Sequence, residues 1–179
     1  MDFFFTQFKI QLFLKWPNDL INENGKKVGG LLAWHSDNNL IIGIGLNLNC
    51  QNLPINAANI LTFPIKLVEK KELLSNLVTY IINNRHENAD TTYQSWMTKC
   101  YRLGSNVQMT EDKKIYDGKL IGIDQDGALL INLNKENQYK NEVGVGVGDG
   151  DGDGDGDGDG DGDGDDQLKK FYSGQLIYK

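Results

Sequence analysis

Apolar residues alternate with polar ones in two regions of the chain, and a stretch with helical spacing separates these regions. The alternation predicts strands at 10–16, 28–35 and 40–49, and the last two form a hairpin across the connection at 36–39. The first nine residues are predicted to be an irregular lead-in, because no basic segment and no small-residue cleavage site marks a signal peptide.

The middle of the chain is predicted to be helical. Leucine, valine and isoleucine recur every three or four residues over 69–85, which indicates an amphipathic helix, and a shorter helix is expected over 91–101. From Ser105 the period changes to two, and short strands are predicted at 107–109, 114–123, 128–133 and 169–179. This order favours an α+β fold with two domains, 1–103 and 104–179, and the second has the strand spacing of a small barrel.

A tract at 144–166 consists almost entirely of glycine and aspartate. It holds ten aspartates and no lysine or arginine, so it is the source of the net charge of −7, and elsewhere 15 acidic residues face 18 basic ones. Because it has almost nothing apolar to bury, we expect a disordered loop between two strands. Five of its residues match the spacing of an EF-hand calcium loop: Asp155, Asp157, Asp159, Gly160 and Asp166. A two-residue repeat produces most of that match in any register, so specific calcium binding is disfavoured.

Composition excludes several classes of protein. No apolar run approaches the 18 residues that indicate a membrane helix, and neither a basic aromatic surface for nucleic acid nor a P-loop is present. Two cysteines, Cys50 and Cys100, and the absence of a glycosylation sequon favour a reducing, cytoplasmic location. Together with His35 and His86 they lack metal-ligand spacing, so no protein metal site is predicted.

The strand at 40–49 has two unlike faces. Alternation gives an apolar face, expected in the core, of Ile42, Ile44, Leu46 and Leu48, and a face of small and polar residues, namely Gly43, Gly45, Asn47 and Asn49. Paired glycines on one face let either a ligand or another part of the protein approach the backbone, and this strand alone leaves both interpretations open.

Two lysines precede the other strand of the hairpin, in the run Lys26-Lys27-Val28-Gly29-Gly30. Lys27 can reach the glycine-bearing face, where an ammonium group suits a phosphate or carboxylate oxygen; alternatively, both lysines lie in a solvated turn. Alternation predicts that Lys27 shares a face with Gly29 and Leu31, and that Lys26 points toward the turn.

These residues follow the motif Lys15-Trp16-Pro17-Asn18-Asp19. The motif, the lysine before a glycine pair and the Gly-X-Gly-X-Asn strand resemble the second half of the catalytic domain of biotin protein ligases, also called holocarboxylase synthetases. Trp96 and the segments 114–133 and 173–179 resemble the family's Trp-containing helix and its carboxy-terminal SH3-like barrel. The resemblance implies a partial biotin/lipoate ligase-type mixed sheet at 1–103 and an SH3-like barrel at 104–179.

The resemblance also implies a reaction in two steps. ATP activates biotin to biotinyl-AMP, and a lysine of the biotin carboxyl carrier domain of a biotin-dependent carboxylase then receives the biotin. Lys27 would be the catalytic cation between the biotin carboxylate and the α-phosphate, and Mg²⁺ would accompany the phosphates. The implied substrate and ATP contacts are Lys15, Trp16, Asn18, Asp19, Gly29, Gly30, Gly43, Gly45 and Asn47.

The first half of the family's catalytic domain has no counterpart in these 179 residues, and neither does its glycine- and arginine-rich loop. Activity is therefore expected to be impaired in the chain as given. A non-catalytic remnant that acts as a binding module and a relative of the lipoate ligases are the alternatives, although the motif at 15–19 and the barrel favour biotin over lipoate.

Overall fold

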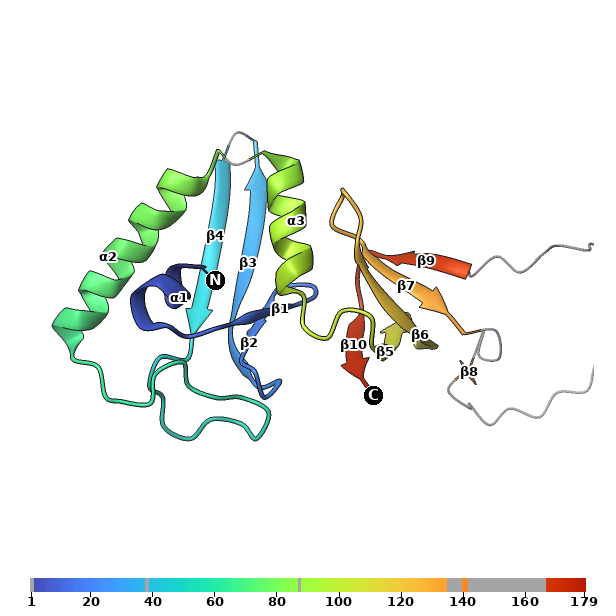
Figure 1. Ribbon diagram of the computed structural model, residues 1–179, viewed down its shortest axis with the longest axis horizontal. Coiled ribbons are helices and arrows are strands. Elements are labelled where there is room, and N and C mark those ends of the chain that lie inside the picture. The colour runs from blue at the N-terminus through green and yellow to red at the C-terminus, as the bar shows by residue number, and fades with distance from the viewer. Residues whose placement is uncertain (1, 38, 87, 135–139, 142–166) are drawn as a thin grey trace, which may run out of the picture. The chain divides into compact units, whose positions relative to one another are not determined.

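The computed structural model describes residues 2–37, 39–86, 88–134, 140–141 and 167–179 (Figure 1). These residues form two compact units, 1–103 and 104–179. The glycine–aspartate tract, for which we expected a disordered loop and weighed a calcium site, lies outside the described residues.

The first unit combines three helices with one antiparallel sheet in the order β1-β2-β3-β4. Its elements are α1 (Asp2–Phe8), β1 (Phe13–Lys15), β2 (Asp19–Ile21), β3 (Lys27–Ser36), β4 (Asn39–Leu46), α2 (Leu67–Asn84) and α3 (Ala89–Lys99). The predicted hairpin is confirmed, because β3 and β4 pair from Gly29–Leu46 to Ser36–Asn39. The two predicted helices are confirmed as α2 and α3.

The prediction of an irregular lead-in is wrong, because residues 2–8 form the helix α1. Phe3 and Phe4 are each only 3% exposed, and the ring of Phe8, one helical turn later, stacks on Phe4 with 6.3 Å between the ring centroids. Aromatic side chains bury a large apolar area, so the helix is held by this contact with the core rather than by a long helical pattern in the sequence.

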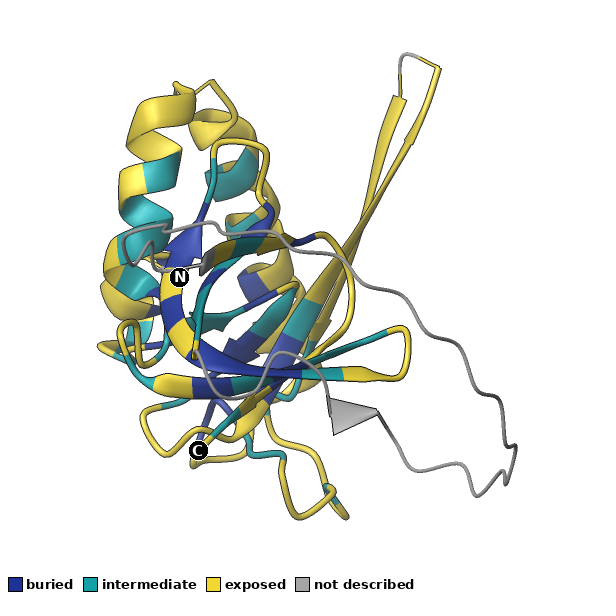
Figure 2. Ribbon diagram, turned by 90° about the vertical axis from the view of Figure 1, so that its right-hand side faces the viewer, coloured by how far each residue is buried: buried dark blue, intermediate teal, exposed yellow. Residues whose placement is uncertain are grey.

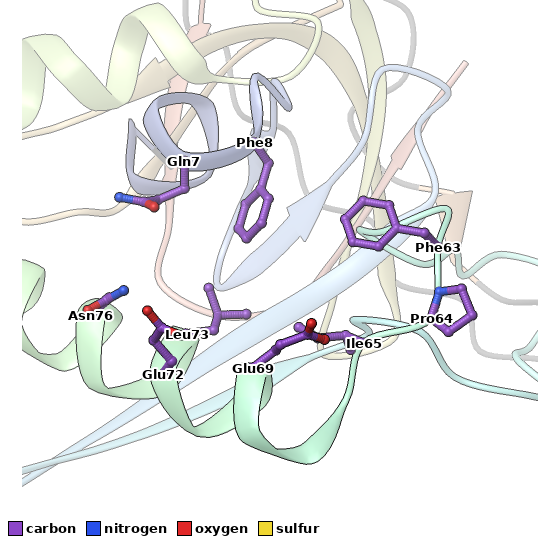
Figure 3. A pocket seen from close by; sticks show the side chains of 9 residues that line it. All are labelled: Gln7, Phe8, Phe63, Pro64, Ile65, Glu69, Glu72, Leu73 and Asn76. Atoms are coloured by element: carbon purple, nitrogen blue, oxygen red, sulfur yellow. The ribbon is translucent and has the colours of Figure 1, made fainter.

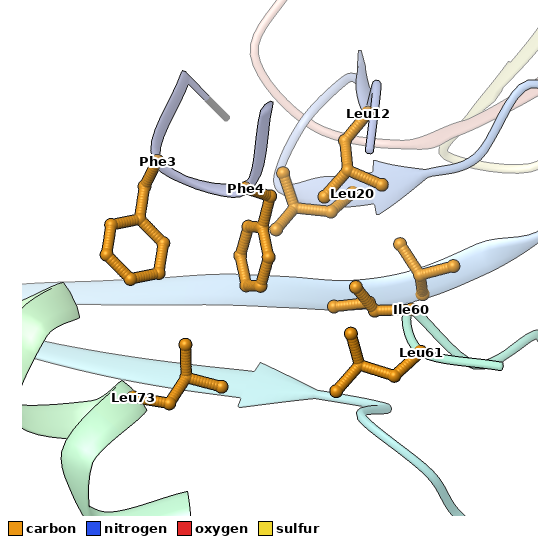
Figure 4. Packing of buried hydrophobic residues seen from close by; sticks show 8 residues of the cluster. Phe3, Phe4, Leu12, Leu20, Ile60, Leu61 and Leu73 are labelled. Carbon is orange, nitrogen blue, oxygen red and sulfur yellow. The ribbon is translucent and has the colours of Figure 1, made fainter. Parts of the chain in front are cut away.

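A cluster of buried apolar residues lies in the core of this unit (Figure 4). It joins α1, the sheet, the segment after β4 and α2, and it consists of Phe3, Phe4, Leu12, Leu20, Val28, Ile60, Leu61 and Leu73.

The apolar face predicted for 40–49 enters this core only at one end. Leu46 and Leu48 pack against the cluster, but Ile42 is 44% exposed and Ile44 is 37% exposed. The prediction is therefore wrong for the outer part of the hairpin, which extends beyond the other elements (Figure 2). Alternation identifies an apolar face, but it does not tell which element covers that face.

The second unit is an antiparallel sheet in the order β10-β5-β6-β7-β9, with β8 beside β6. Its strands are β5 (Asn106–Glu111), β6 (Lys114–Ile123), β7 (Leu129–Leu133), β8 (Lys140–Asn141), β9 (Gln167–Phe171) and β10 (Gln175–Tyr178). The single strand predicted at 169–179 is wrong, because the chain turns at Gly174 (φ +126°) and the two halves pair with different strands, β7 and β5. None of the helices in the described part of the chain is long and apolar enough to cross a bilayer.

Asp124 organises the turn between β6 and β7. Its Oδ1 accepts hydrogen bonds from the N–H groups of Asp126 (2.9 Å) and Ala128 (3.0 Å), and its Oδ2 accepts one from Lys170 Nζ (2.6 Å). The hydrogen bond from Lys170 lowers the pKa of Asp124, and the same bond raises the pKa of Lys170.

We expect Phe4→Ala to destabilise the first unit by about 3–5 kcal/mol, because it leaves a cavity under α1. Phe5 is 52% exposed on the same helix, so Phe5→Ala serves as the control and should cost less than about 1 kcal/mol. Urea unfolding followed by tryptophan fluorescence measures both. Equal losses would mean that α1 does not contribute to the core.

The Asp124–Lys170 pair should stabilise the second unit over a broad pH range. A lowered carboxyl pKa contributes stability above its ordinary value of 3.8, and that contribution disappears as the pH falls through the lowered pKa. A raised lysine pKa contributes below 10.5 and is lost as the pH rises through the raised pKa. Asp124→Asn should therefore speed amide exchange in β6 and β7 at neutral pH, but not at a pH below the lowered pKa of Asp124. Asp112→Asn, in another turn, is the control, and a deficit that persists in acid would exclude the ion pair as its cause.

Candidate functional site

A β-bulge at Val28 determines which way Lys27 points. Asp19 pairs with Gly30 and Leu20 pairs with Gly29, but Ile21 pairs with Lys27, so Val28 is the extra residue on β3. Across this bulge the alternation shifts by one residue. Lys27 therefore shares a face with Asp19 and Gly30, and the prediction that placed it with Gly29 and Leu31 is wrong.

Two kinds of contact fix Lys27. Its backbone N–H donates to Asn56 O (2.9 Å), and its carbonyl accepts from the N–H of Ala58 (2.9 Å). Its Nζ lies 2.5 Å from Asp19 Oδ1 and its side chain is half exposed. By contrast, Lys26 is exposed in the preceding turn, where its N–H donates to Asn22 Oδ1 (3.0 Å).

Lys27 lines a hollow of about 740 Å³ on the β3–β4 hairpin, which we call the glycine hollow. Seven of the predicted site residues line it: Asn18, Lys27, Gly29, Gly30, Gly43, Gly45 and Asn47. Lys15 and Asp19 instead line a neighbouring hollow of about 290 Å³ that also contains Trp96, although Asp19 reaches the first hollow through its ion pair with Lys27. Trp16 is buried and lines neither hollow.

The sequence analysis missed the apolar residues of the glycine hollow, which are Leu31, Leu32, Ile44 and Leu46. Ile44 and Leu46 alternate with Gly43 and Gly45 on β4, whereas Leu31 and Leu32 follow the glycine pair on β3. The signal was present in the sequence, but the outward face of an apolar strand was assigned to the core.

The glycines of the hollow are there for different reasons. A Cβ on Gly29 would lie 2.6 Å from the carbonyl oxygen of Gly45, so packing against β4 requires a glycine at this position. A Cβ on Gly43 or Gly45 would meet its nearest neighbour at 3.9 Å or 4.0 Å, which is ordinary van der Waals contact. Nothing in the described protein therefore requires glycine at 43 and 45, and this favours the interpretation that they leave space for a ligand.

The two asparagines are held by the backbone around the hollow. Asn47 Nδ2 donates to Lys27 O (3.3 Å), and the Asn47 N–H donates to Val28 O (2.8 Å). The carbonyl of Asn18 accepts from the N–H of Leu31 (2.9 Å), which ties the turn after Pro17 to β3.

The glycine hollow offers one cation to an anionic ligand, and the Asp19 carboxylate lies 2.5 Å from that cation. Among the described residues that line it, Lys27 is the only charged one, and Asn18 and Asn47 add amide groups. Neither cysteine lines it: Cys50 is exposed, and burial raises the pKa of Cys100 to about 12, so this thiol is not a nucleophile at neutral pH. The described residues contain no group of three potential metal ligands from histidine, cysteine, aspartate and glutamate.

Another hollow, of about 290 Å³, lies between α1, the segment before α2 and α2 itself (Figure 3). We call it the acidic hollow, because its charged residues are Glu69 and Glu72. Glu69 Oε2 accepts the N–H of Lys66 at 2.6 Å and so caps α2. Two carboxylates repel an anion, so the acidic hollow does not suit the anionic ligand expected beside Lys27.

Comparison with known proteins identifies proteins that are similar to this chain in sequence and in structure. No protein-family model matches the chain. It is 27% identical over 140 residues to the bifunctional ligase/repressor BirA of Bacillus subtilis strain 168, and the match covers 70% of this chain and 43% of that protein. A second relative, from Bacillus spizizenii, gives 27% identity over 42% of its length. The chain thus spans less than half of the curated relatives that it matches.

Solved structures share the fold. The chain matches the biotin protein ligase of Aquifex aeolicus with a TM-score of 0.67 and 21% identity, over 99% of this chain and 70% of that chain. A structure of the same ligase in complex with biotin and ATP gives a TM-score of 0.65 at 21% identity, over 99% and 67%. The predicted α+β fold of the biotin ligase type is confirmed.

The glycine analysis predicts opposite effects at two neighbouring positions. Gly29→Ala should destabilise the first unit, because the added methyl group would lie 2.6 Å from a backbone oxygen of β4 rather than from the end of a flexible side chain. Gly45→Ala should leave the stability within about 0.5 kcal/mol, because the methyl group enters the hollow. Thermal unfolding measures both, and a large loss at Gly45 would restore the packing interpretation.

Proposed function

We propose that this chain, which is similar in sequence to BirA and shares the fold of biotin protein ligases, holds biotinyl-AMP in the glycine hollow. The observation that carries the proposal is the position of Lys27, the only cation in the described lining of a hollow that Gly30, Gly43 and Gly45 also line. We propose further that the first unit is a partial catalytic domain and that the second is the SH3-like barrel of the family.

The chemistry needs a fixed cation at one point. A biotin carboxylate oxygen attacks the α-phosphorus of ATP, the bond to the β-phosphate oxygen breaks, and pyrophosphate leaves. Lys27 offsets the repulsion between these two anions and the charge that builds on the α-phosphate. An acceptor lysine then attacks the acyl carbon, and AMP leaves with the bonding electron pair.

Asp19 is proposed as the residue that positions Lys27. Their 2.5 Å ion pair holds the ammonium group beside Gly30, where a Cβ would lie 3.6 Å from Lys27 Cε. A ligand oxygen that approaches along the glycine-bearing face can share this cation without a large movement of the side chain. Mg²⁺ is expected to arrive on the phosphates of ATP.

The glycines and the asparagines have complementary roles in the proposal. Gly43 and Gly45 leave the space that the acyl-phosphate occupies, and Asn18 and Asn47 offer amide groups to the nucleotide side. The acceptor is proposed to be a biotin carboxyl carrier domain of a biotin-dependent carboxylase. Lys15 and Trp16 stay outside this hollow, so for them we propose a role in holding the turn at Pro17 rather than a contact with the ligand.

Two alternatives remain to be separated by experiment. A relative of the lipoate ligases would bind lipoyl-AMP in preference to biotinyl-AMP, and a non-catalytic remnant would bind neither. The similarity to a ligase that was solved in complex with biotin and ATP favours biotin. A reducing, cytoplasmic location fits the two free thiols and is proposed on that ground.

Lys27→Ala should weaken the binding of biotinyl-AMP by the 179-residue chain by about 10-fold to about 100-fold, because the only cation in the described lining is lost. Lys26→Ala is the matched control, because it removes an exposed charge one residue away and should change nothing measurable. Isothermal titration calorimetry with a hydrolysis-resistant biotinyl-AMP analogue measures both. Equal effects would contradict the assignment of Lys27, and preference for lipoyl-AMP would identify the lipoate alternative.

Biotin-dependent ATP–pyrophosphate exchange tests the activity separately. We expect the 179 residues alone to exchange slowly, since a single cation is a sparse set of donors for a triphosphate and each missing donor costs about 10²–10³ in rate. Fast exchange that Lys27→Ala abolishes would show an active enzyme and would contradict the expected impairment.

A further inference from the structure

The chain between β4 and α2 contains a loop at 50–59 that passes beside the start of β3 (Figure 1). One side chain closes this loop. The Cys50 N–H donates to Asn59 Oδ1 (2.7 Å), and Asn59 Nδ2 donates to Cys50 O (3.1 Å). An asparagine amide both accepts and donates, so here it pairs with the two polar groups of one backbone residue, as a neighbouring strand does. We call these two hydrogen bonds the Asn59 clamp.

The far part of the loop holds the backbone of Lys27. The Lys27 N–H donates to Asn56 O (2.9 Å), and the Ala58 N–H donates to Lys27 O (2.9 Å). Lys27 and Ala57 thus form a parallel bridge. On its other side Lys27 pairs with Ile21 of β2. The loop therefore acts as a short additional strand along the residue whose ammonium group lines the glycine hollow.

Lys27 depends on this loop because β4 does not reach it. The pairing of β3 with β4 ends at Gly29 and Leu46, two residues beyond Lys27. The bulge at Val28 lies in between, and a bulge locally disrupts the hydrogen bonding of a ladder. The loop takes the place of β4 as the neighbour of Lys27.

The tip of the loop is not anchored in the core of the described protein. Ile55 is 93% exposed, and the turn at the tip is closed by a hydrogen bond from the Ala57 N–H to Pro54 O (2.9 Å). A loop of this kind samples many conformations unless its ends are held, because ordering each residue costs conformational entropy.

The residues that follow the loop are anchored independently of its tip. Ile60 and Leu61 are buried, and their N–H groups donate to Asn47 O (2.7 Å) and Leu48 O (2.9 Å). Asn59 directly precedes this anchored pair. Its side chain therefore connects a fixed point of the chain with the start of the loop, and so restricts where the tip can lie.

We propose that Asn59 is a positioning residue for Lys27: the clamp holds the loop against the start of β3 and so keeps the Lys27 ammonium group at the glycine hollow. Asn59 does not line that hollow, so it acts through Lys27 and not by a contact with the ligand. This inference rests on the proposed function, in which Lys27 binds the anionic part of biotinyl-AMP.

Amide exchange followed by NMR tests the clamp in the free 179-residue chain. Asn59→Ala should speed the exchange of the Lys27 and Ala58 N–H groups by about 5-fold to about 50-fold, because two hydrogen bonds that hold the loop are lost. The Ile60 N–H, which bonds beyond the clamp, should exchange as in the wild type. Gln51→Ala removes an exposed side chain of the same loop and is the matched control, which should change none of these rates.

A double-mutant cycle connects the clamp with the ligand. Calorimetry with the hydrolysis-resistant biotinyl-AMP analogue should show that Asn59→Ala weakens binding by about 3-fold to about 10-fold. In the Lys27→Ala background the same substitution should have no further effect, because the group that it positions is gone. A residue that only stabilises the fold would act equally in both backgrounds, and thermal unfolding confirms that each variant is folded at the temperature of the titration.

Two results would overturn the proposal. Unchanged exchange at Lys27 and Ala58 in Asn59→Ala would mean that the loop holds Lys27 without the clamp. An undiminished effect of Asn59→Ala in the Lys27→Ala background would mean that Asn59 acts on the ligand by another route. A failure of the proposed function is distinguishable from both, because Lys27→Ala alone would then leave binding unchanged, while the exchange rates still decide whether Asn59 holds the backbone of Lys27.

Discussion

Val28 is fully buried in the core of the first unit, and the bulge that accommodates it sets the orientation of Lys27 at the glycine hollow. The extra residue leaves Leu20 opposite Gly29 and brings Lys27 onto the face of Asp19 and Gly30. A regular ladder would have turned the lysine to the other face, away from Gly43 and Gly45. A buried side chain thus determines where the only charge in the described lining of the hollow lies.

Helices and strands in which apolar residues repeat at a regular spacing could be predicted from the sequence. The hairpin follows from alternation, and α2 and α3 follow from helical spacing, because these patterns depend on neighbouring residues alone. The site residues from Asn18 to Asn47 were found through a motif whose parts lie close together in sequence, and seven of them line one hollow.

What the sequence did not reveal depends on distant contacts. The helix α1 is stabilised by Phe3 and Phe4 in a core built from residues up to Leu73, and seven residues carry too little periodicity to predict a helix. The split at Gly174 arises because the flanking segments pair with strands far apart in the chain. The orientation of Lys27 required the register of β2 against β3, which alternation within one strand does not contain.

The glycines of β3 and β4 would tolerate substitution differently if the protein no longer had to bind a ligand. The contact between Gly29 and the carbonyl of Gly45 makes position 29 a requirement of folding, so it would persist in any lineage that keeps the fold. Positions 43 and 45 have room for a side chain within the described protein, so a requirement for glycine there would come from a ligand. A remnant that had lost its ligand would drift at these two positions first. Both are still glycine in this chain.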